Sequence, residues 1–246
     1  MNLMELKNQF DPDLRKIIKN QKKAVIIPVG SIEQHGAHLP ISTDSDIVTE
    51  IAKKTADRCD FLLLPTISYG VSFEHAPLFN LSIKGSTLQK MIFEICASLS
   101  KNGIRTIFII NGHYSNQKFL QHLPSLVKRQ TRGKTRVFVF SYWHFMSQRF
   151  DHAGFVETSL MRAISNKVNM KKAKRGLITD VLSKRKVALL NKLASKSFTK
   201  VAKSGVWGDP TRATRRDGNR ILAETVRNLA KTCQTYLTEK NRKLHH

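Results

Sequence analysis

The chain has 246 residues, of which 41% are hydrophobic, and its formal net charge is +24. This length and hydrophobic content suit one α/β domain with a substantial core, so we predict a single domain over residues 1–246. The longest apolar runs are far shorter than the roughly 20 residues that cross a bilayer, and MNLMELKNQF at the N-terminus lacks the apolar stretch of a signal peptide. The three cysteines form no CxxC pair, which argues against a disulfide framework and a thiolate zinc site. We therefore predict a cytoplasmic protein without membrane association.

The first half of the chain alternates apolar runs with segments of helical periodicity. KAVIIPVG at 23–30 predicts a buried strand, and SDIVTEIAKKTADRC predicts a helix after it, with Asp44 as the N-cap residue. FLLLPTISYG at 61–70 predicts a second strand, and a second helix is expected from Ser86 or Thr87 to a stop at Gly103.

Two further strands are predicted from RTIFIINGH at 105–113 and RVFVFSYW at 136–143. Strands that alternate with helices indicate a three-layer α/β fold with a mostly parallel central sheet. In such sheets, ligands bind beyond the carboxyl ends of the strands, where the strand-to-helix turns converge.

Ligand-type side chains follow the predicted strands. Glu33 and His35 come after the first strand, the stretch SFEH after the second, and His113 after the third. Residues two apart in an extended chain share a face, so Glu33 and His35 can face one metal site. Carboxylates with neutral imidazoles suit Zn, Mn or Fe(II), and an aspartate such as Asp44 can bridge two ions. The pattern predicts a metal site at the edge of the sheet.

Positive charge is concentrated in the second half of the chain. Residues 1–125 contain 14 Lys/Arg and 11 Asp/Glu, whereas residues 126–246 contain 28 and 7. Such a charge attracts anionic substrates, nucleic acids or acidic partners, and it is equally typical of a solvated basic face. No ribonucleoprotein motif, zinc finger or basic heptad array is present, so no dedicated nucleic-acid motif is predicted. The Lys-rich part, 167–205, has weak periodicity and predicts a mobile or helical insertion.

Four stretches carry a resemblance to a known family. PVGSIEQHGAHLPISTD, NGHYSN, DHAGFVETS and GVWGDP followed by ATRRDG resemble, in this order, the signature stretches of the creatininase (creatinine amidohydrolase) family, over roughly residues 23–235. The resemblance implies a Rossmann-like fold, two divalent metal ions per chain, hydrolysis of an amide-type C–N bond other than a peptide bond, and a homohexamer. Of the possible metals we expect Zn, with Fe(II) or Mn as alternatives.

The resemblance also implies the metal ligands. Glu33, His35, Asp44 and His113 match the metal ligands of the family, with Asp44 at the bridging position. Glu157 matches a further acidic position that completes the site. A metal pair of this kind activates water at neutral pH and polarises a carbonyl.

Other residues are expected to act on the proton or the substrate. His152, five residues before Glu157, is the expected general acid/base, because an imidazole titrates near neutral pH and can pass a proton to a leaving amine. Ser72 and Tyr114 match positions that contact substrate in the family. His38 and His75 are expected to support the ligands rather than bind metal.

Two departures from creatininase proper bear on the substrate. This chain has Ser115 where creatininase has Glu, and Gln148-Arg149 where creatininase has Trp-Asp. A guanidinium grips phosphate or carboxylate bidentately, so we predict that Arg149 binds an anionic small molecule. The reaction that fits best is deformylation of a phosphorylated formamidopyrimidine, as in one branch of the family, and the alternatives are a creatinine-type cyclic amide or a small peptide.

A function of another class is a basic nucleic-acid-binding protein that has lost catalysis. In such a protein the metal ligands would be the first residues to decay, and all of them are present here. The sequence therefore favours an enzyme.

Overall fold

The computed structural model describes residues 4–21 and 23–242. Its sheet has the strand order β1-β3-β2-β4-β5, and each neighbouring pair of strands is parallel. The strands are β1 (Met4–Glu5), β2 (Val25–Val29), β3 (Leu62–Leu63), β4 (Thr106–Asn111) and β5 (Arg136–Ser141). The predicted parallel α/β sheet is confirmed.

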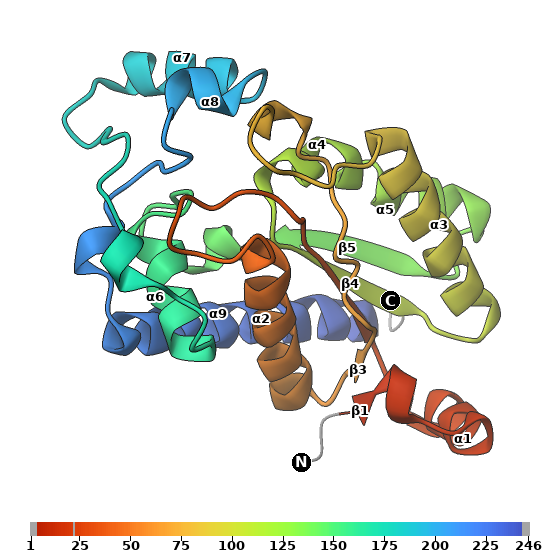
Figure 1. The fold of residues 1–246 in the computed structure, drawn as a ribbon. Coiled ribbons are helices and arrows are strands. Elements are labelled where there is room, and N and C mark those ends of the chain that lie inside the picture. The colour runs from red at the N-terminus through yellow and green to blue at the C-terminus, as the bar shows by residue number, and fades with distance from the viewer. Residues whose placement is uncertain (1–3, 22, 243–246) are drawn as a thin grey trace.

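Helices cover both faces of this sheet (Figure 1). The α-helices are α1 (Asp11–Gln21), α2 (Thr43–Cys59), α3 (Gly85–Lys101), α4 (Gln117–Leu120), α5 (Leu123–Gln130), α6 (Phe155–Ile164), α7 (Lys184–Ala194), α8 (Phe198–Val201) and α9 (Arg215–Arg242). Short 3-10 helices are η1 (Leu6–Asn8), η2 (Phe73–His75), η3 (Tyr114–Asn116), η4 (Tyr142–Phe145), η5 (Met170–Lys172) and η6 (Pro210–Arg212).

Alternation along the strands divides the core into two layers. Ile26 and Phe108 pack with α2, α6 and α9 on one face, whereas Ile27 and Ile107 pack with α3 and α5 on the other. Successive residues of a strand point to opposite faces, so a strand buried on both sides reads as a continuous apolar run. Each of these fully buried side chains contributes about 1.5–3 kcal/mol relative to exposure.

Two glycines let α2 approach the ends of β2 and β4. A Cβ on Gly30 would lie 2.4 Å from Ser45 Oγ, and a Cβ on Gly112 would lie 2.7 Å from Val48 Cβ. Larger residues at these positions would push α2 away, because real Cβ atoms do not approach so closely. The first turn of α2 therefore sits directly over the strand ends.

The ends of the central strands are level. Val29 pairs with Asn111, and Asn111 pairs with Ser141, so the segments that leave β2, β4 and β5 start at the same edge of the sheet. This edge is where the predicted site residues gather.

The Lys-rich part, 167–205, is helical in part, which agrees with one of the two alternatives predicted. It contains α7 and α8, which stand together beyond this edge of the sheet, and α8 contacts η2 (Figure 1). No helix within residues 4–21 and 23–242 is long and apolar enough to span a membrane.

Candidate metal centre

The segment after β2 turns Glu33 and His35 inward. The backbone N–H of Glu33 donates to Ile41 O at 3.0 Å, and the N–H of Gln34 donates to Phe79 O at 2.8 Å. Both Glu33 and His35 are fully buried, as expected for two residues on one face of an extended segment.

Asp44 lies between two histidines. Its Oδ1 is 3.2 Å from His35 Nε2, and its Oδ2 is 3.0 Å from His113 Nδ1. The prediction that Asp44 is the N-cap of α2 is wrong: the N-cap is Ser42, and Asp44 is the second residue of the helix. Asp44 makes no capping contact, and its two oxygens instead face the imidazoles of His35 and His113.

Backbone carbonyls orient the two imidazoles. His113 Nε2 lies 2.8 Å from Val71 O, and His35 Nδ1 lies 3.0 Å from Glu33 O, so in each ring this nitrogen donates the proton. When the ring is neutral, the other nitrogen carries the lone pair, and it is the nitrogen that faces Asp44. A histidine that binds a metal is typically held in its tautomer in this way.

Each side of Asp44 has a second carboxylate. Glu33 Oε2 is 3.2 Å from His113 Nδ1, and Glu157 Oε2 is 3.5 Å from His35 Nε2. Glu157 lies in the first turn of α6 and accepts a 2.6 Å hydrogen bond from the N–H of Ala153. The five predicted ligands thus converge as two sets that share Asp44.

Four oxygens of these carboxylates lack hydrogen-bond partners within residues 4–21 and 23–242. Within the described part of the chain, both oxygens of Glu33, Oδ2 of Asp44 and Oε1 of Glu157 are buried and accept no hydrogen bond. An unpaired buried charge is expensive, and a divalent cation offsets that cost. Among the described residues, three groups bring their ligand atoms within 4.8 Å of one another: Glu33, His35 and Asp44; Glu33, His75 and His152; and His35, His152 and Glu157. The donor set therefore fits divalent metal ions.

Crowding shifts the pKa values of the cluster. Burial lowers the pKa of His35, but Asp44 and Glu157 outweigh it and raise the value to about 10. Burial raises the pKa of Asp44, but His35 and His113 outweigh it and hold the value well below its usual range. The pKa of Glu157 is raised to about 8, because burial and the charge of Asp44 raise it more than His35 lowers it. A metal ion needs these imidazoles and carboxylates deprotonated, so it competes with protons for the same atoms.

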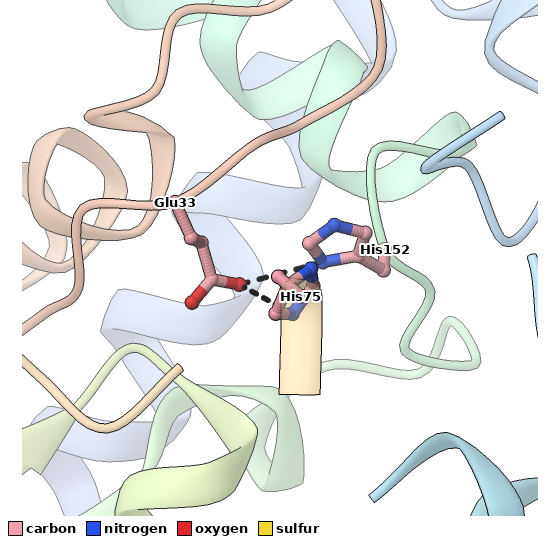
Figure 2. Close-up of side chains that lie close together, drawn as sticks. All are labelled: Glu33, His75 and His152. Atoms are coloured by element: carbon pink, nitrogen blue, oxygen red, sulfur yellow. Dashed lines mark ion pairs between the residues drawn. The ribbon is translucent and has the colours of Figure 1, made fainter. Parts of the chain in front are cut away.

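His152 stands beside the cluster. Its Nδ1 is 3.9 Å from Glu33 Oε1, and its ring lies 4.3 Å from the ring of His35. Figure 2 shows His152 and His75 converging on the same oxygen of Glu33. Burial, followed by the charges of His35 and His75, holds the pKa of His152 well below its usual value, which favours a neutral ring at pH 7. The ring can therefore accept a proton.

Of the two expected supporting histidines, His75 contacts the cluster directly. His75 Nε2 lies 3.1 Å from Glu33 Oε1, whereas His38 Nε2 lies 2.9 Å from Thr158 Oγ1.

Asp151, which the sequence did not single out, accepts the N–H of Val156 at 2.9 Å and so fixes the start of α6, from which Glu157 projects.

Gln34 is a second residue that sequence reasoning missed. Its Nε2 lies 2.9 Å from His75 Nδ1 and 3.1 Å from His152 Nε2, and its Oε1 accepts the N–H of Gly36 at 2.9 Å. The backbone O of Gln34 also lies 3.2 Å from His152 Nε2, so Gln34 contacts both histidines that face Glu33. Its position between Glu33 and His35 in the sequence was the available signal.

We expect Gln34→Leu to lower kcat by about 10-fold to 100-fold with metal content unchanged, the usual range for a residue that orients site groups. Gln89→Leu is the matched control, because Gln89 Nε2 donates to Phe119 O on α4, away from the cluster. Steady-state kinetics and metal analysis of both variants check this. Wild-type turnover in Gln34→Leu would show that the two contacts do not position His75 and His152.

A cavity of about 270 Å³ opens onto the cluster, and Asp44, His113, His152 and Glu157 line it. Five aromatic side chains also line it: Tyr114, Trp143, Phe150, Phe198 and Trp207. The space suits a small organic group with apolar parts.

Two of the three predicted substrate residues line the cavity, and the third does not. Tyr114 and Arg149 line the cavity, and Arg149 Nη1 lies 3.7 Å from Asp180 Oδ1. Ser72 is fully buried, does not line the cavity, and its Oγ has no hydrogen-bond partner among the described residues. Substrate contact stays a prediction for all three.

Ser115, one of the departures noted above, donates a short hydrogen bond to Glu74 Oε1. Glu74 also lies 3.7 Å from His113 Nε2 and lines the cavity. A carboxylate is therefore present beside Ser115, but it comes from η2 rather than from the segment after β4.

Comparisons with known proteins find similar sequences and structures. The family model for creatinine amidohydrolase matches residues 9–233. A mycofactocin precursor peptide peptidase of Mycobacterium ulcerans is 35% identical over 219 residues, 82% of this chain and 81% of the relative. Creatinine amidohydrolase of Pseudomonas putida is 30% identical over 166 residues, 57% of this chain and 64% of the relative.

Solved structures show the same fold. A creatininase mutant of Zn-Zn type superposes with a TM-score of 0.82 at 23% identity, covering 96% of this chain and 99% of that one. The deformylase branch is more distant: a formylaminopyrimidine monophosphate deformylase of Methanosphaera stadtmanae is 27% identical over 42% of this chain and 46% of the relative. The chain belongs to the creatininase (creatinine amidohydrolase) family of metal-dependent amidohydrolases, which act on C–N bonds.

Proposed function

We propose that the chain hydrolyses an amide C–N bond of a short peptide or peptide end, with two divalent metal ions held around Asp44. The observation that carries this proposal is the position of Asp44, whose two oxygens face two separate histidines. Glu33 and His113 would hold one ion, His35 and Glu157 the other, and Asp44 both. Zn is the expected metal, with Mn or Fe(II) as alternatives.

In this mechanism the metal ions, when bound, activate water and polarise the amide carbonyl. His152 moves the proton: its Nε2 donates to the backbone O of Gln34 at 3.2 Å, which leaves the lone pair on Nδ1, and Nδ1 accepts the proton that water loses and returns it to the leaving amine nitrogen. Gln34 and His75 keep the surrounding side chains in place. The products are a carboxylic acid and an amine.

Two observations support a peptide over the other substrates of the family. Among the curated sequence relatives, those that match more than four-fifths of the chain are peptidases, whereas the creatinine amidohydrolase match covers 57% of the chain and the deformylase match 42%. The aromatic side chains around the cavity also suit the apolar side chains of a peptide. The hexamer and the cytoplasmic location stay predictions from the family resemblance and the cysteine pattern.

A substrate panel tests the proposal. Protein reconstituted with Zn or Mn is incubated with short peptides, creatinine and a phosphorylated formamidopyrimidine, and products are followed by mass spectrometry. We expect cleavage of at least one peptide that stops on chelation and returns with metal. Turnover of the formamidopyrimidine alone would establish the deformylase instead, the second candidate that Arg149 favours.

We expect Arg149→Ala to raise KM about tenfold for a peptide with a free carboxylate close to the scissile bond, and hardly at all for its C-terminal amide. A charge-assisted contact contributes on the order of 1.5–3 kcal/mol, and the value should lie at the low end because the Arg149 side chain is 55% exposed. Arg175→Ala is the control, since Arg175 pairs with Asp209 outside the cavity. Equal KM ratios for the two peptides would exclude anion binding by Arg149.

A further inference from the structure

The segment that contains α7 and α8 has an unusual charge pattern. Between Asp180 and Asp209 the chain contains seven Lys or Arg residues and no Asp or Glu. Helix α7 carries four of them, and it is capped by Ser183, whose Oγ accepts the N–H of Lys186. No acidic side chain of this segment neutralises that charge, so its field acts on partners in solution.

The outer face of α7 also carries exposed apolar side chains. Leu189 is 56% exposed and Leu193 is 47% exposed, and they lie one helical turn apart. Arg185, Lys186 and Lys192, all exposed, lie on the same side by helical spacing. These five residues, Arg185, Lys186, Leu189, Lys192 and Leu193, are here called the α7 face, which offers a partner adjacent apolar and cationic side chains.

The other side of the insertion closes the cavity. Asn191, Ala194 and Ser195 line the cavity, and Phe198 of α8 packs 4.6 Å from the ring of His75 and 4.7 Å from that of His152. A chain bound on the α7 face is therefore next to the entrance of the metal centre.

We infer that the α7 face docks an acidic, amphipathic segment of the polypeptide substrate, while an end of that polypeptide enters the cavity. Cations on the face attract acidic side chains and raise the rate of encounter, and the leucines bury apolar ones. Nucleic acid is a poorer occupant, since phosphate contacts would leave the leucines exposed. A membrane surface is also poorer, because an interfacial helix needs a wider apolar face. This inference rests on the proposed peptidase function.

Fluorescence anisotropy tests the docking directly. The probe is a fluorescein-labelled helical peptide of 16 residues built from Glu and Leu, and its control has Gln in place of Glu. We expect the wild type to bind the Glu peptide about tenfold more tightly than the Gln peptide. We expect Arg185→Glu/Lys192→Glu to lose about tenfold in affinity for the Glu peptide, because two cations become anions.

The matched control is Lys128→Glu/Arg129→Glu on α5, an exposed basic pair of the same charge change. It should bind the Glu peptide as the wild type does. A second variant, Leu189→Ser/Leu193→Ser, should bind the Glu peptide more weakly although the net charge of the protein is unchanged. Circular dichroism and metal content identify any variant that fails to fold.

Several outcomes overturn the inference. Equal losses of affinity for the Glu peptide in the α7 and α5 variants would show that binding depends only on the net charge of the protein. Tighter binding of a 20-base-pair DNA duplex or of anionic vesicles than of the peptide would assign the face to another partner, and a change in oligomeric state of the α7 variants would assign it to a second copy of the chain. Failure of the peptidase proposal is distinguishable, since anisotropy requires no turnover: binding without hydrolysis refutes the activity, and hydrolysis with unaltered binding in the α7 variants refutes the docking.

Discussion

Asp44→Ala is expected to leave the purified protein without either metal ion. One oxygen of Asp44 faces His113 and the other faces His35, so this carboxylate is the group that both ligand sets share. Glu33→Ala and His35→Ala should each chiefly weaken one ion, because Glu33 lies on the His113 side and His35 pairs with Glu157 on the other. Elemental analysis by mass spectrometry gives the stoichiometry.

Asp46→Ala is the control for Asp44→Ala. Asp46 lies in the same first turn of α2, but its Oδ2 accepts a hydrogen bond from Ser42 Oγ at 2.8 Å. It should keep the wild-type metal content. Two ions per chain in Asp44→Ala would show that this carboxylate does not bridge the ions.

His152→Ala should lower turnover by roughly 100-fold to 10,000-fold, the range for the loss of a positioned general acid/base. Metal content should stay the same, since His152 Nδ1 is 3.9 Å from Glu33 Oε1, while the five expected ligands make closer contacts with one another. The measurement is kcat together with metal analysis of the same preparation. His122→Ala, at an exposed histidine before α5, is the control.

A different result would reassign His152. If His152→Ala loses metal, the imidazole is a ligand, as the cluster of His35, His152 and Glu157 within 4.8 Å would allow. If it keeps both metal and turnover, another group moves the proton.

Much of the sheet edge could be predicted because it depends on local patterns. The apolar runs of β2 and β4 are continuous, as strands buried on both faces must be, and polar groups follow each of them directly. Parallel pairing then brings Glu33, His35 and His113 to one edge regardless of loop details.

Other features depend on contacts between distant segments. Gln34 lies 118 positions from His152 in the chain, and its role follows only from the fold. The burial of Ser72 and the pairing of Glu74 with Ser115 likewise arise where η2 meets η3. The N-cap of α2 was predicted at the wrong residue, because aspartate is a common N-cap but the carboxylate of Asp44 faces His35 and His113 instead.

The most direct test of a shared metal centre is electron paramagnetic resonance of chelated protein refilled with Mn²⁺. Two ions joined by the Asp44 carboxylate should give an exchange-coupled spectrum at saturation, and this spectrum should be absent from Asp44→Ala. Hydrolysis of a peptide should appear together with the coupled signal. A spectrum of isolated Mn²⁺ ions in saturated wild-type protein would contradict the account.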